Sequence, residues 1–78
     1  MDPEDDEILH SRTFYITFGR HHQHRRGNMT IGIDDVVGHK STSYGKAHEW
    51  AVNTFGYNFE MLVERLPVGV DLRDVIHL

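Results

Sequence analysis

The feature of this sequence with the clearest chemical potential is a cluster of imidazoles. The chain has seven histidines, and three of them lie close together, at His21, His22 and His24. Imidazole nitrogens are common ligands of zinc, nickel and copper, and an H-x-H pair in an extended segment directs both rings to one side. His22 and His24 are therefore the candidate metal ligands of this chain.

A solvated basic loop is the competing interpretation of the same segment, and we favour it. Arginines flank the histidines on both sides, at Arg20, Arg25 and Arg26. Their charges repel a dication, and no Asp or Glu lies between Ile8 and Ile33 to complete a site. We therefore expect neither a metal nor another cofactor.

Phosphate groups are a second class of ligand for this segment. Arginines and protonated histidines on a protruding hairpin can pair with phosphates, and Tyr15 on the polar face of the preceding strand would add base stacking. Acidic residues elsewhere oppose a broad basic surface, at Asp34, Asp35, Glu49, Glu60 and Glu64. Nucleic-acid binding is therefore kept as the alternative to the function that we favour.

Catalysis has little support in the sequence. His48-Glu49 lacks the second histidine that a zinc protease motif needs. The hydroxyls of residues 41–43 stand near His39, but such residues more often cap a helix than attack a carbonyl. A chain of 78 residues also has little room for a substrate pocket of about 300 Å³ beside its core. We predict that the protein is not an enzyme.

Composition indicates one small domain of an ordinary soluble protein. The chain has 78 residues, 38% of them hydrophobic and 26% charged, and no cysteine, which excludes disulfides and thiolate chemistry. Acidic residues are concentrated at the start, where we predict a flexible leader over residues 1–9, followed by a single domain over 10–78. This acidic start is unlike a secretory signal, and no apolar run is long enough to span a membrane. A cytoplasmic location is expected.

Hydrophobic periodicity predicts the first two strands. Residues 13–19 alternate strictly, with Phe14, Ile16 and Phe18 on one face. Residues 20–28 contain no apolar side chain and predict an exposed hairpin loop. A second strand follows over 29–33, extendable through Val36 and Val37, with a bulge or bend at the aspartates before them.

The second half of the chain predicts a loop over 38–42, a helix over 44–55 and a third strand. Ser43 is the expected N-cap and Gly56 the expected C-terminal stop. The buried stripe of the helix is expected at Tyr44, Ala47, Ala51 and Phe55, with Trp50 at its border. In the third strand the inward residues are expected at Phe59, Met61 and Val63, and residues 71–78 are left open between a short helix and a short strand.

These elements predict an α+β fold. It consists of a single three-stranded sheet in ββαβ order, with the one helix packed on the apolar face and the third strand beside the first.

The order of these segments resembles a group of small uncharacterised proteins of tailed bacteriophages, especially those that infect actinobacteria. The resemblance rests on a strand ending in Phe18-Gly19, the segment His22-Gln23-His24, and a helix containing Ala47 and ending in Phe55-Gly56. It covers residues 13–64. The chain departs from the group at Phe59, where a tryptophan is usual, and in its more basic loop. The resemblance implies the fold and a phage origin in a bacterial host cytoplasm, and it implies no activity.

Binding without catalysis is the function that remains. We expect a phage accessory protein that contacts a host or phage protein, or a second copy of itself. Trp50 is either a core-edge residue, which we favour, or an exposed aromatic anchor for a partner. The predicted contact set is completed by the basic hairpin, at Arg20, His21, His22, His24, Arg25 and Arg26.

Overall fold

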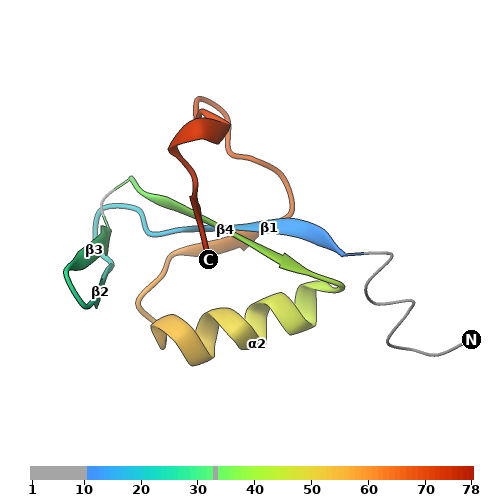
Figure 1. Cartoon of the computed structure of the whole chain (residues 1–78), viewed down its shortest axis with the longest axis horizontal. Helices are drawn as coiled ribbons and strands as arrows, with labels where there is room; N and C mark the ends of the chain where they lie inside the picture. The colour runs from blue at the N-terminus through green and yellow to red at the C-terminus, as the bar shows by residue number, and fades with distance from the viewer. Residues whose placement is uncertain (1–10, 33) are drawn as a thin grey trace, which may run out of the picture.

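The structure of the chain is a computed structural model that describes residues 11–32 and 34–78, without the side chain of Arg26. The predicted acidic leader lies outside the described residues. Within them the protein is an α+β fold with one helix, a four-stranded mixed sheet and a separate two-stranded sheet (Figure 1). The predicted class is confirmed, whereas the predicted three strands and ββαβ order are wrong.

The larger sheet brings together segments from both ends of the chain. Its strands are β1 (Arg12–Thr17), β4 (Val36–Ser41), β5 (Met61–Val63) and β6 (Ile76–His77), in the order β5-β1-β4-β6. β1 is antiparallel to both β4 and β5, and β6 is parallel to β4. The expectation that the strand after the helix lies beside the first strand is confirmed.

The smaller sheet is a hairpin of β2 (Gln23–Arg26) and β3 (Met29–Gly32). It turns at Gly27-Asn28, where Gly27 has a φ of 60° that favours glycine. The prediction of an exposed hairpin loop over 20–28 is therefore wrong at residues 23–26, which form a strand. Polar side chains form a strand there because the paired strand β3 buries Ile31 completely and supplies the apolar contact.

The predicted second strand is in fact two strands that belong to different sheets. Asp34 adopts a left-handed φ of 67° and its amide donates to the carbonyl oxygen of Gly19 at 3.1 Å. Next to it, the Asp35 carboxylate accepts from the amide of Gly32 at 2.9 Å. This turn separates β3 from β4, and β4 covers most of the segment that was predicted as a loop over 38–42.

Helix α2 (Tyr44–Phe55) has the predicted boundaries and caps. The hydroxyl of Ser43 accepts from the amide of Lys46 at 3.2 Å, and Gly56 ends the helix with a φ of 66°. Ala47, Ala51 and Phe55 are buried against the sheet, as their spacing predicts. Tyr44 is 47% exposed, so its assignment to the buried stripe is wrong.

Substitution Ser43→Ala tests this cap. Loss of the hydroxyl that accepts from the Lys46 amide is expected to lower the free energy of unfolding by about 1 kcal/mol. Urea denaturation followed by far-UV circular dichroism measures the change. Ser43→Asp is the matched control, because a carboxylate caps as well as a hydroxyl does. Equal stability of the alanine variant and the natural chain would contradict the role of this cap.

The core lies between the sheet and α2. Phe14, Ile16 and Phe18 of the first strand segment are fully buried, as predicted. In β5 the inward residue is Leu62, which pairs with Ile16, so the expected face of Met61 and Val63 is wrong. The register against β1 decides this, since a shift of one residue exchanges the two faces of a strand.

The C-terminal segment contains both structures that the sequence left open. Asp71 caps a short 3-10 helix, η1 (Leu72–Asp74), and β6 follows it. The 3-10 helix lies on the side of the sheet opposite α2, and β6 runs from it to the edge of the sheet beside β4 (Figure 1). Val75 is buried beside Gly38, so it covers part of the sheet face opposite α2.

Candidate functional site

The basic hairpin has one face against the domain and one face toward solvent. His24 pairs with Ile31, and its ring meets the ring of Phe55 edge-on at a centroid distance of 4.9 Å. Arg25 pairs with Thr30, and both are exposed. Because neighbouring residues of a strand point to opposite faces, His24 faces the domain and Arg25 faces solvent.

The two histidines that were candidate metal ligands both contact the body of the domain. Nδ1 of His22 donates to the carbonyl oxygen of Phe18 at 3.3 Å, and the side chain is half-buried. His24 packs on Phe55, as described above. Within residues 11–32 and 34–78, no three His, Cys, Asp or Glu side chains are placed to hold a metal ion. The H-x-H spacing is thus explained by packing of the hairpin base.

The solvent side of the hairpin carries the charged groups. Arg20, His21, Gln23 and Arg25 are exposed. No carboxylate of the described residues forms an ion pair with Arg20 or Arg25, whereas Arg12 pairs with Glu64 at 2.7 Å. Of the predicted contact residues, Arg20, His21 and Arg25 can therefore meet a partner without first breaking an internal contact.

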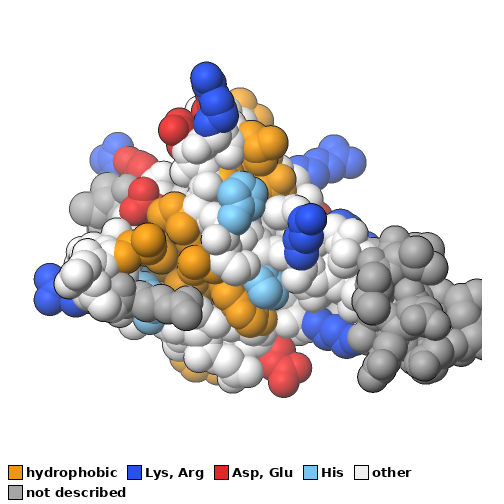
Figure 2. All heavy atoms as spheres, viewed as in Figure 1, with side chains coloured by type: hydrophobic (Ala, Val, Ile, Leu, Met, Phe, Trp, Pro, Cys, Tyr) orange, Lys and Arg blue, Asp and Glu red, His pale blue; other side chains and the backbone are white. Residues whose placement is uncertain are grey.

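Carboxylates lie at the base of the same hairpin. Asp34 and Asp35 form the turn to β4, and the carboxylate of Glu60 occupies the space beside Gly19 that a side chain there would need. These groups line a cleft of about 210 Å³. On the face shown in Figure 2, acidic and basic side chains lie next to one another at the hairpin end of the molecule. The surface around the hairpin is therefore mixed in charge.

Trp50 lies at the border of the core, on the side of α2 that faces β4. Its ring stacks on the ring of His39, with centroids 3.7 Å apart and an interplanar angle of 3°. It also meets Phe55 edge-on at 5.6 Å. Since Phe55 contacts His24 as well, a continuous row of rings connects Trp50 to the hairpin. The border position predicted from the helical spacing agrees with this packing.

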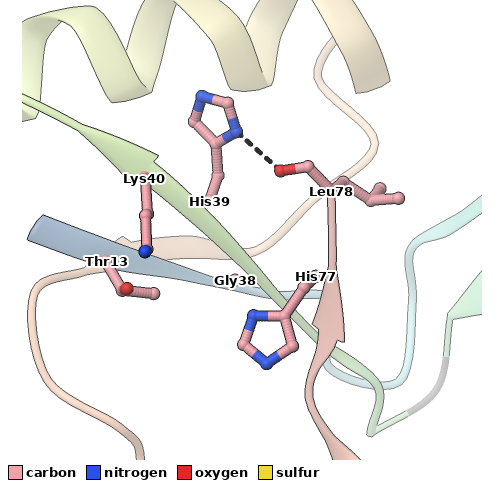
Figure 3. A pocket seen from close by; sticks show the side chains of 6 residues that line it. All are labelled: Thr13, Gly38, His39, Lys40, His77 and Leu78. Atoms are coloured by element: carbon pink, nitrogen blue, oxygen red, sulfur yellow. Dashed lines mark hydrogen bonds between the residues drawn. The ribbon is translucent and has the colours of Figure 1, made fainter.

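A cleft of about 350 Å³ beside the end of β6 was missed by the sequence reasoning (Figure 3). Figure 3 shows His39 directed toward α2, where its Nδ1 donates to the carbonyl oxygen of Leu78 at 2.9 Å. Lys40, Thr13 and His77 lie on the other side of the strand. Residues 38–41 show no alternation of apolar and polar side chains. The sequence therefore predicted neither a strand there nor its position beside residues 77 and 78.

The described ionisable groups with a perturbed pKa lie away from these clefts. Hydrogen bonds from the Arg73 side chain and, secondarily, its backbone amide lower the pKa of the Asp71 carboxyl, and the same pairing raises the pKa of Arg73. Asp71 caps η1 and Arg73 lies in it, and both side chains are exposed. They stabilise the turn locally and do not indicate a catalytic group.

No helix among the described residues has the length and apolar character needed to cross a membrane. Comparison with known proteins finds no matching family model, no matching curated protein and no matching solved structure. The case for a function therefore depends on the geometry of the chain itself.

Proposed function

We propose that the chain is a non-enzymatic phage accessory protein that acts in the host cytoplasm by binding another protein through the solvent face of the hairpin. One observation carries this proposal: Arg20 and Arg25 are exposed and have no ion-pair partner among the described residues. The bacteriophage origin rests on the sequence resemblance described above. Arginine is enriched at protein interfaces, where its planar guanidinium binds carboxylates in two-pronged geometry.

A protein partner fits this surface better than a nucleic acid does. The carboxylates of Asp34, Asp35 and Glu60 at the hairpin base would repel a phosphate backbone that ran past the two arginines. Apolar side chains also gather beside the hairpin on the face shown in Figure 2. A mixed charged and apolar surface is typical of protein interfaces, and the partner is expected to present carboxylates to the hairpin.

The double substitution Arg20→Glu/Arg25→Glu tests the proposal. The natural chain is used to capture a partner from lysate of the host cell, and the Kd of the purified pair is then measured by biolayer interferometry. Charge reversal at a desolvated ion pair is expected to weaken binding by about tenfold or more. Lys40→Glu/Arg65→Glu is the matched control, since it makes the same change in net charge at exposed positions outside the hairpin.

An unchanged Kd in the hairpin variant would refute the proposed contact surface. Binding of the natural chain to single-stranded or duplex DNA, falling steeply with salt and lost in Arg20→Glu/Arg25→Glu, would instead favour the nucleic-acid alternative. Concentration-dependent sedimentation abolished by the same substitutions would identify a second copy of the chain as the partner.

A further inference from the structure

A groove runs between α2 and the outer strand β5, on the side of the helix opposite Trp50. Its volume is about 270 Å³, and it is lined by Tyr44, His48, Phe59, Glu60, Met61 and Leu62. The rings of Tyr44 and His48 stack at a centroid distance of 6.3 Å, and His48 meets Phe59 edge-on at 6.3 Å. Aromatic rings therefore line the helical wall of the groove, and polar and apolar groups contribute to its surface in similar measure.

One wall of the groove is an open sheet edge. β5 is the outermost strand of its sheet and pairs only with β1 among the described residues. Its other edge presents backbone amide and carbonyl groups that a further strand can pair with. Met61 is 53% exposed beside this edge, and Tyr44 is 47% exposed on the helix across the groove.

We propose that this groove binds an extended peptide of another protein, which adds to β5 as a strand and inserts an apolar side chain between β5 and α2. Main-chain hydrogen bonds to the strand edge would supply affinity, and the aromatic groove would select the side chain. The groove shares Glu60 with the cleft at the hairpin base, but it does not depend on the function proposed above.

The charges at the groove favour a peptide that carries Lys or Arg next to its apolar residue. Glu60 lines the groove, is exposed, and has no ion pair among the described residues. Glu64 follows β5 directly and is already paired with Arg12. No Lys or Arg of residues 11–32 and 34–78 is placed in the lining of the groove, so Glu60 is the carboxylate that remains for a basic residue of the peptide.

The same charges disfavour a second copy of the chain as the occupant. If two β5 strands paired antiparallel about Leu62, Glu60 of each copy would stand opposite Glu64 of the other. Like charges directly opposite each other in a sheet are destabilising, and charged residues at edge strands oppose such self-pairing. A basic peptide would instead meet the unpaired carboxylate of Glu60 favourably.

A random nine-residue peptide library displayed against the immobilised full-length chain tests the proposal. Enriched peptides are expected to share an apolar residue with Lys or Arg beside it. Titration of one such synthetic peptide into the ¹⁵N-labelled chain is expected to shift the amide signals of Met61, Leu62, Val63 and His48. Absence of enrichment, or shifts confined to the hairpin, would overturn the proposal.

Two substitutions are expected to weaken the selected peptide by at least about fivefold: Tyr44→Ser, which removes the aromatic wall, and Glu60→Lys, which reverses the free carboxylate. Tyr57→Ser and Asp74→Lys are the matched controls, because Tyr57 is 82% exposed outside the groove and Asp74 lies on η1.

Arg20→Glu/Arg25→Glu should leave peptide affinity unchanged, which separates peptide binding in the groove from partner binding at the hairpin. Equal affinity of Glu60→Lys and the natural chain, or a dimer in solution that Met61→Glu dissociates, would overturn the assignment.

Discussion

Substitution Phe18→Ala is expected to lower the free energy of unfolding by about 3–5 kcal/mol. Phe18 is fully buried, and its ring meets that of Phe55 edge-on at 5.1 Å. Its removal leaves a cavity between the sheet and α2. Because domains are stabilised by only about 0.05–0.15 kcal/mol per residue, such a loss would remove a large part of the stability of a chain of 78 residues.

Urea denaturation followed by the fluorescence of the single tryptophan measures this effect, since Trp50 packs on Phe55. Phe59→Ala is the matched control: it removes the same side chain from a half-buried position at the margin of the core. We expect the control to lose less than half as much stability. Equal losses would show that Phe18 is not the centre of this core.

Substitution Gly38→Val is expected to detach the C-terminal segment from the sheet. A Cβ at position 38 would lie 2.9 Å from Cγ1 of Val75 and 3.2 Å from Nδ1 of His77, closer than unstrained contacts allow. Overpacking of this kind costs about 1–3 kcal/mol. Because β6 is only two residues long, displacement of the segment is expected rather than unfolding of the whole chain.

Hydrogen exchange at the amide of Leu78 reports the displacement directly, since this amide donates to the carbonyl oxygen of Gly38 at 3.0 Å. Its protection is expected to disappear in Gly38→Val while the amides of α2 stay protected. Gly45→Ala is the control of opposite sign: a Cβ there meets nothing within 4 Å, so alanine should stabilise the helix by about 0.5–1 kcal/mol. Retained protection at Leu78 would contradict the close packing of Gly38.

The placement of the hairpin depends on the same core. His22 bonds to the carbonyl oxygen of Phe18 and His24 packs on Phe55, so the two histidines hold the inner face of the hairpin while Arg20 and Arg25 remain outside. The sequence favoured a solvated loop for the histidine cluster, whereas His22 and His24 contact the body of the domain. The sequence identified this segment as basic and rich in histidine, and it did not show which of its side chains face the domain.

Local sequence patterns were sufficient to predict those elements whose formation depends on residues close together in the chain. The alternation of Phe14, Ile16 and Phe18 predicts the buried face of the first strand, because successive side chains of a strand point to opposite sides. The cap at Ser43 and the stop at Gly56 likewise predict the helix boundaries, since they depend on hydrogen bonds and backbone conformation within one turn.

Tertiary contacts decided the rest. β4 is a strand at Gly38 because β1 and β6 pair with it from either side, although its own residues have no apolar alternation. Leu62 is the inward residue of β5 because the register against β1 places it opposite Ile16. Both the cleft beside β6 and the groove beside β5 arise from segments distant in the chain. Periodicity reports which residues of a segment share a face, whereas only packing between segments determines which face is buried and which edge stays open.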